Sequence, residues 1–153
     1  MKLGDVLRKE REKKKLAPER VAEALGIPEE RYAEMEAGAS PAEVWGPRLG
    51  KVAIALETPT SRLLAESGRA ADCRPGQAGR LIRQHRERRG KSPEELAAAL
   101  DVSADEVRAI EEGATPLEEQ GPLLLRFAEL IEQPVFNLFY PCGLPFDTLD
   151  DYP

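Results

Sequence analysis

The stretches VAEALGIPEERYAEME (residues 21–36) and LAAALDVSADEVRAIE (residues 96–111) decide the fold of this chain. In each, apolar side chains spaced three or four residues apart predict a short helix, then a break at Gly26 or Asp101, then a second short helix. Pro18 and Pro93 stand just before the two stretches, where the first turn of a helix tolerates proline. Each stretch therefore predicts two short helices joined by a tight turn.

The two stretches belong to a longer repeat. Residues 3–64 align with residues 78–139 at a constant offset and without gaps. Chance similarity between helical segments would not keep glycines and prolines in register over so long a stretch. The sequence therefore predicts a tandem duplication. The identical pairs include Gly4/Gly79, Arg8/Arg83, Arg11/Arg86, Pro18/Pro93, Glu36/Glu111, Gly38/Gly113, Gly46-Pro47/Gly121-Pro122 and Pro59/Pro134.

Helix start and stop signals predict an all-α protein made of two five-helix units. In the first copy the expected helices cover residues 3–15, 18–25, 28–36, 46–56 (after a turn at 41–45) and 59–67. In the second copy, Ser92 and Ser103 are suitable N-caps for the second and third helices. The expected organisation is a first domain over residues 1–67, a linker over 68–76, a second domain over 77–140 and an irregular tail over 141–153.

This pattern resembles the helix-turn-helix of the Cro/repressor (XRE) family. That family has an Arg late in its first helix, an apolar-Ala pair, a turn glycine and a closing Glu-x-Gly. The first copy carries Arg11, Val21-Ala22, Gly26, Glu36 and Gly38, and the second carries Arg86, Leu96-Ala97, Asp101, Glu111 and Gly113. The resemblance implies two lambda-repressor-like helix-turn-helix domains in tandem, each presenting its third helix to the DNA major groove. It also implies structural ion pairs Arg11–Glu36 and Arg86–Glu111.

The sequence departs from that family where its members read DNA. Pro18 and Pro93 replace the Gln that usually starts the second helix and contacts phosphate. The third helix of the first copy carries Glu29, Glu30 and Glu34 on its expected exposed face. Carboxylates in the first turn complement the helix dipole, which accounts for Glu29 and Glu30. Three of them oppose binding to a groove lined by phosphates.

The basic residues gather instead at the end of the first helix of each copy. Phosphate contacts there would supply affinity with little sequence discrimination. A solvated, charged helix face is the alternative. With the polar groups of the third helices, the candidate DNA contacts are Lys13, Lys14, Lys15, Arg31, Arg88, Arg89, Lys91, Ser92, Ser103 and Arg108.

Two functions fit these features. The first is a DNA-binding transcriptional regulator of the XRE family, with DNA as its partner. The second is a protein-interaction adaptor or antitoxin-like protein that kept the fold and lost sequence-specific reading, with a protein partner or a second copy. Phe139, Tyr140, Leu144 and Phe146 near the C-terminus form a candidate docking patch, and core packing is the alternative for them.

Charge and composition bear on whether the chain is a nucleic-acid-binding, membrane or secreted protein. The net charge is −6, and residues 1–75 carry 14 Lys/Arg against 13 Asp/Glu while residues 76–153 carry 8 against 15. Such a balance argues against a surface built entirely for phosphate. No apolar run is long enough for a membrane helix and the first residues lack a secretory signal, so we expect a cytoplasmic protein.

The sequence contains few residues in patterns typical of metal sites or catalytic sites. We expect Cys73 and Cys142 to be a reduced pair, although a disulfide is conceivable, and we expect no zinc because no CxxC spacing occurs. The carboxylates lie on expected helix surfaces without a glycine-rich loop or a paired nucleophile. The sequence therefore predicts no enzyme activity, no metal and no cofactor.

Overall fold

The computed structural model describes residues 1–60 and 76–144, and these residues form helices without any strand. The first half contains α1 (Leu3–Lys13), α2 (Pro18–Leu25), α3 (Glu29–Glu36) and α4 (Ala42–Ala55). The second half contains α7 (Gln77–Arg88), α8 (Pro93–Leu100), α9 (Ala104–Glu111) and α10 (Leu117–Leu130). Two 3-10 helices follow, η1 (Val135–Leu138) and η2 (Tyr140–Cys142). The expectation of an all-α protein is thus met throughout the described residues.

The fourth helix of each half is longer than the sequence predicts. It begins at Ala42 or Leu117, so that Pro47 and Pro122 lie inside α4 and α10. A proline disfavours helical geometry in the preceding residue because its ring clashes with that residue's Cβ. Gly46 and Gly121 have no Cβ, which removes this clash. The predicted fifth helices also differ: η1 is a 3-10 helix, and the first copy's segment from residue 61 onward lies outside the described residues.

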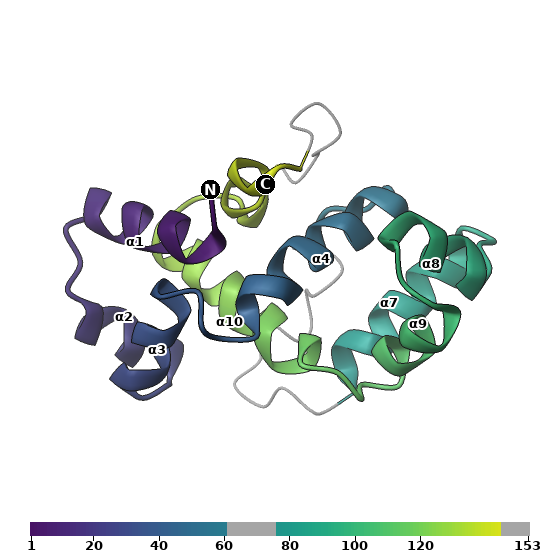
Figure 1. Cartoon of the computed structure of the whole chain (residues 1–153), viewed down its shortest axis with the longest axis horizontal. Helices are drawn as coiled ribbons and strands as arrows, with labels where there is room; N and C mark the ends of the chain where they lie inside the picture. Colours follow the sequence, from purple (N-terminus) through teal and green to yellow (C-terminus); the bar gives the residue numbers. More distant parts are fainter. Residues whose placement is uncertain (61–75, 145–153) are drawn as a thin grey trace.

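The fourth helix of each half packs on both halves (Figure 1): α4 contacts α1 of its own half, and α10 contacts α7 of its own half. The helices α1–α3 form one lobe and α7–α9 form the other, and α4 and α10 pack against each other between the lobes. Helix α4 contacts α8 of the second half, and α10 contacts α2 of the first half. One hydrophobic core therefore runs through both lobes. Tyr32 of α3 and Phe127 of α10 stack within it, with ring centroids 6.4 Å apart.

A glutamate at the start of each fourth helix caps the first helix of the same half. Both Glu43 carboxylate oxygens accept hydrogen bonds, from the backbone N–H groups of Leu3 and Gly4, each at 3.0 Å. Glu118 accepts from three backbone N–H groups at the start of α7, those of Gly76, Ala78 and Gly79. Neither α1 nor α7 has a capping side chain of its own at its N-terminus. These carboxylates therefore satisfy N–H groups that the helices leave without partners.

The structure also bears on the sequence-based expectations for membrane helices and cysteines. No helix in residues 1–60 and 76–144 combines the length and the apolar character that crossing a membrane requires. Cys142 is a free, half-buried thiol, and burial raises its pKa above the ordinary value. Cys73 lies outside the described residues.

Candidate nucleic-acid interface

Each lobe contains two short helices joined by the same tight turn. Gly26 ends α2 with φ of 70°, and Asp101 ends α8 with φ of 56°, so both residues adopt the left-handed conformation. Glycine does so without a steric penalty, and aspartate is among the residues that tolerate it best. The replacement of the turn glycine by Asp101 in the second copy therefore leaves the geometry of the turn unchanged.

An arginine–glutamate pair ties the first helix of each lobe to the end of the third. Arg11 Nε lies 2.5 Å from Glu36 Oε1, and Arg86 Nε lies 2.5 Å from Glu111 Oε1. Each guanidinium also donates to a backbone carbonyl in the loop that follows, that of Leu16 or Lys91. The Glu111 side chain is only 1% exposed, against 13% for Glu36, so the second pair is the more deeply buried.

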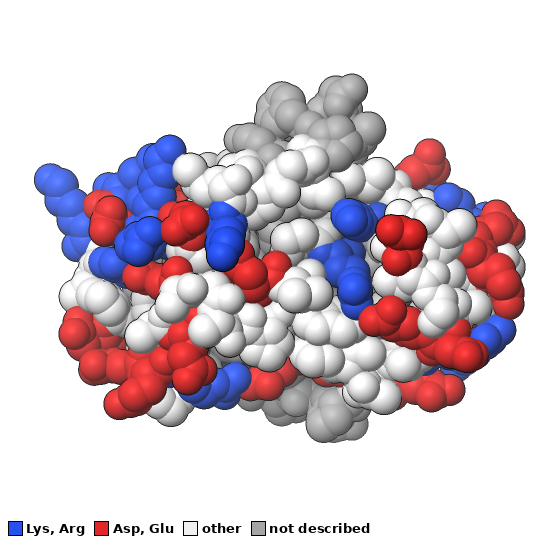
Figure 2. Space-filling view, in the orientation of Figure 1, with Lys and Arg blue, Asp and Glu red and all other residues white. Residues whose placement is uncertain are grey.

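The third helix of the first lobe presents an acidic surface. Glu29, Glu30 and Glu34 are all exposed on α3, as the sequence suggested. Glu29 and Glu30 also line a shallow hollow between α2 and α3, together with Glu19 and Glu23. Figure 2 shows Asp and Glu side chains concentrated over this part of the molecule, below the basic side chains that gather over α1. An approaching phosphate would meet like charge at this surface.

Part of the predicted basic set is accessible at the loops that follow α1 and α7. Lys15 and Arg88 are exposed and have no ion-pair partner among the described residues. Lys13 bonds to Glu10 on its own helix at 2.9 Å, and its side chain is 58% exposed. Lys14 is 3.5 Å from Glu132, which belongs to the second half. These four cations remain available to a ligand at the surface.

Two predicted phosphate contacts are engaged elsewhere. Arg89 donates to the Glu57 carboxylate and to the Glu57 carbonyl oxygen, each at 2.9 Å. Lys91 Nζ donates to the carbonyl oxygen of Ala55 at 2.5 Å. Both cations thus cap the C-terminal end of α4, where helix carbonyls lack partners and the helix dipole is negative. The packing of α4 on the second lobe, which the repeat does not reveal, gives both cations these intramolecular partners.

The other predicted polar contacts have intramolecular partners too. Arg31 on α3 forms an ion pair with Glu119 on α10, in the other half. Arg108 on α9 lies 3.0 Å from Asp105 and 2.9 Å from Glu94. The hydroxyls of the two predicted serine caps accept backbone N–H groups at the starts of α8 and α9, each at 3.1 Å. These caps are Ser92, bonded to Glu95 N, and Ser103, bonded to Glu106 N.

Some contacts between the halves could not be found by reading one copy at a time. Arg48 on α4 bonds to Glu106 on α9 at 2.7 Å, and it also covers the ring of Trp45 at 4.5 Å. Arg126 on α10 donates to the carbonyl oxygen of Leu25, the last residue of α2, at 3.2 Å. The sequence separation of these partners, and their placement in different copies, leave no local signal for them.

The C-terminal docking patch is not supported at the positions that the structure describes. The side chains of Phe139 and Leu144 are buried in the core, 0% and 9% exposed, and are unavailable to a partner. The glycines of α4 create the space for them, because a Cβ on Gly50 would overlap Leu144 and crowd Phe139. The side chain of Tyr140, and Phe146 as a whole, lie outside the described residues.

Comparisons with known proteins agree with the geometry of the second lobe. Residues 77–134, which run from the start of α7 past the end of α10, match the family model described as a helix-turn-helix domain. Neither the curated proteins nor the solved structures gave a significant match. The second half of the chain thus resembles a helix-turn-helix domain over these residues.

Proposed function

We propose that this chain is a DNA-binding transcriptional regulator of the Cro/repressor (XRE) type, with two lambda-repressor-like units in tandem. The match of residues 77–134 to a helix-turn-helix domain carries the proposal. The recurrence of the same helices in the first half supports it, since α2, α3 and α4 have the bounds of α8, α9 and α10 shifted by a constant number of residues. On this proposal the chain acts by binding and needs no catalytic centre.

The basic loops after α1 and α7 would contact the DNA backbone. In helix-turn-helix complexes the helices before the recognition helix lie against the phosphates. Lys13, Lys14 and Lys15 in the first lobe and Arg88 in the second supply cations in that region. Arg31 and Arg108 would have to leave intramolecular carboxylates to reach a base. Binding would therefore depend on phosphate contacts and discriminate weakly between sequences.

A second candidate function is a protein-interaction adaptor or antitoxin-like role. The acidic surface of the first lobe favours it, because Glu29, Glu30 and Glu34 are exposed where a DNA-reading helix would carry neutral or basic side chains. On this candidate function the helix-turn-helix is a scaffold, and a partner with a basic surface would meet α3. The two functions differ in their response to DNA.

An electrophoretic mobility shift across a salt titration separates the two. We expect random duplex DNA to be bound at about 50 mM salt and released as the salt concentration rises, because counterion release drives binding. The double variant Lys15→Glu/Arg88→Glu should bind DNA much more weakly. If each residue contacts one phosphate, the slope of log affinity against log salt should become roughly 2 units shallower.

The matched control is Lys2→Glu/Arg80→Glu, which changes the net charge equally. Lys2 precedes α1, and Arg80 lies two helical turns before Arg88, about 12 Å along α7. The control should keep most of the affinity of the natural chain. Absence of binding to any DNA at about 50 mM salt would overturn the regulator proposal and leave the adaptor function.

A further inference from the structure

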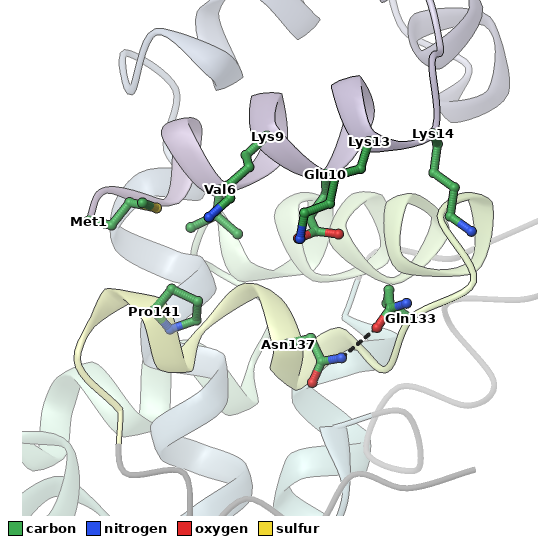
Figure 3. Close-up of a pocket in the computed structure, with 9 residues that line it drawn as sticks. All are labelled: Met1, Val6, Lys9, Glu10, Lys13, Lys14, Gln133, Asn137 and Pro141. Atoms are coloured by element: carbon green, nitrogen blue, oxygen red, sulfur yellow. Dashed lines mark hydrogen bonds and ion pairs between the residues drawn. The ribbon is translucent and has the colours of Figure 1, made fainter.

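A cavity of about 360 Å³ lies between α1 and the segment that follows α10 (Figure 3). This volume is at the lower end of the range for small-molecule sites in proteins. One wall is α1 with the residue after it, Lys14, and α1 itself contributes Lys9, Lys13 and Glu10. The opposite wall comes from the end of the second half, with Gln133, Asn137 and Pro141. Of the proposed DNA contacts, Lys13 and Lys14 also line the cavity, whereas Lys15 and Arg88 do not.

The charge of the cavity favours an anion. The lysines of the lining, Lys9, Lys13 and Lys14, outnumber its one carboxylate, Glu10, by two charges. Lys9 has no ion-pair partner among the described residues, whereas Lys13 bonds to Glu10 and Lys14 to Glu132. Figure 3 shows the Lys9, Lys13 and Lys14 side chains extending from α1 toward the facing segment. Because Glu132 offsets the charge of Lys14, one positive charge remains in excess, and it favours an anionic ligand.

The facing wall supplies neutral donors at a fixed position. Asn137 Nδ2 donates to Gln133 Oε1 at 2.7 Å, which orients both side-chain amides. The bond leaves the Gln133 amide N–H groups and one N–H of Asn137 for a ligand. Met1, Val6 and Pro141 give the cavity an apolar part, and Val6 is 2% exposed. The lining thus combines a few polar groups with apolar side chains, as small-molecule sites do.

We propose that this cavity binds a small organic anion, with Lys9 and Lys13 holding its charge and the Asn137–Gln133 amides fixing its orientation. A short dicarboxylate and a sugar phosphate share this chemistry. The proposal does not depend on DNA binding, because the site is defined by its own lining and binding is measured without DNA.

The test is a titration of the full chain, labelled with ¹⁵N, in which the side-chain amide signals of Asn137 and Gln133 are followed by NMR. Succinate and ribose 5-phosphate serve as the two probes, with sodium chloride at equal ionic strength as the reference. We expect one probe to shift these signals saturably, with half-saturation below about 1 mM, which corresponds to roughly 4 kcal/mol. The probe that saturates at the lower concentration identifies the ligand class.

Substitutions test the assigned residues. Lys9→Gln/Lys13→Gln should weaken binding at least about tenfold, because it removes two charge-assisted hydrogen bonds. The control Lys2→Gln/Lys51→Gln removes equal charge outside the cavity lining and should bind as the natural chain does. Asn137→Asp, which places a negative charge in the site, is a second, independent variant and should also weaken binding. Equal shifts with chloride, no shift with either probe, or a response to duplex DNA alone would overturn the proposal.

Discussion

At the scale of single residues, the glutamates that cap α1 and α7 allow a specific prediction about stability. Glu118 accepts three backbone N–H groups, and the N–H groups freed by its removal can bind water, so the total loss stays near that of a single hydrogen bond to a charged group, about 1.5–3 kcal/mol. We expect Glu118→Ala to lower the free energy of unfolding by about 2–3 kcal/mol in urea denaturation. Glu112→Ala, at an exposed glutamate in the same half, is the control and should change stability by less than about 0.5 kcal/mol.

The buried arginine–glutamate pairs give a second prediction by comparison between the halves. Removing one partner of a buried pair leaves an uncompensated charge and costs about 3–5 kcal/mol. We expect Glu111→Gln to approach this range because the carboxylate is 1% exposed. Glu36→Gln, at the equivalent and more exposed position, should cost less. Equal losses for the two variants in thermal or urea denaturation would contradict this interpretation of their burial.

Tyr32 makes stability depend on pH in the alkaline range. Its burial, and then the neighbouring Glu36 carboxylate, raise the pKa of the hydroxyl well above its ordinary value of 10.0. Below pH 10 both the folded and the unfolded chain keep the proton. Above pH 10 the unfolded chain loses it first, so the free energy of unfolding falls with rising pH, by at most about 1.4 kcal/mol per pH unit. Between pH 8 and pH 10.5, the free energy of unfolding measured in urea should fall less for Tyr32→Phe than for the natural chain. Equal decreases for the two chains would contradict this role of Tyr32.

At the scale of elements, the sequence predicts most of the helices and misses how α4 is used. Pro18, Pro93, Ser92 and Ser103 mark helix starts correctly because capping is a local interaction. The start of α4 is mispredicted because Gly46-Pro47 usually marks a turn, whereas here the missing Cβ of glycine lets a helix pass through the proline. The partners of Arg89 and Lys91 were not predictable, since they depend on how the C-terminal end of α4 packs on the second lobe.

The C-terminal end of α4 gives a prediction at this scale. Lys91 and Arg89 neutralise carbonyls that the helix leaves without partners. We expect Lys91→Met to lower the free energy of unfolding by about 0.5–2 kcal/mol at low salt, and this difference to shrink in high salt where charge–dipole interactions are screened. Arg88→Met, at an exposed neighbour without an ion pair to any described residue, should leave stability nearly unchanged. A loss at Lys91 that did not vary with salt would indicate packing by the lysine stem instead.

At the scale of the whole molecule, the repeat predicts two similar units but not that α4 and α10 pack on both of them. The repeat specifies which residues of each copy are apolar, and Leu49 and Leu124 are both buried as a result. It does not specify whether an apolar helix face packs on its own lobe or on the other. For the same reason the candidate interface was only partly predicted: Arg11 and Arg86 bond within their lobes, where the family pattern places their partners, while Arg31 bonds across the lobes.

The packing of α4 and α10 on both lobes makes the two halves one cooperative unit, and this is testable by unfolding. Helix α4 covers α8, and α10 covers α2, so unfolding of either lobe exposes apolar surface in the other. We expect a single urea transition, in which the fluorescence of Trp45 on α4 coincides with the far-UV signal of all helices. Phe127→Ala removes the ring stacked on Tyr32 of the other half. It should lower the free energy of unfolding by about 3–5 kcal/mol, by the same amount whether fluorescence or the far-UV signal is followed. Two separate transitions, or a shift confined to one signal, would show that the lobes unfold independently and that the shared core contributes little to their association.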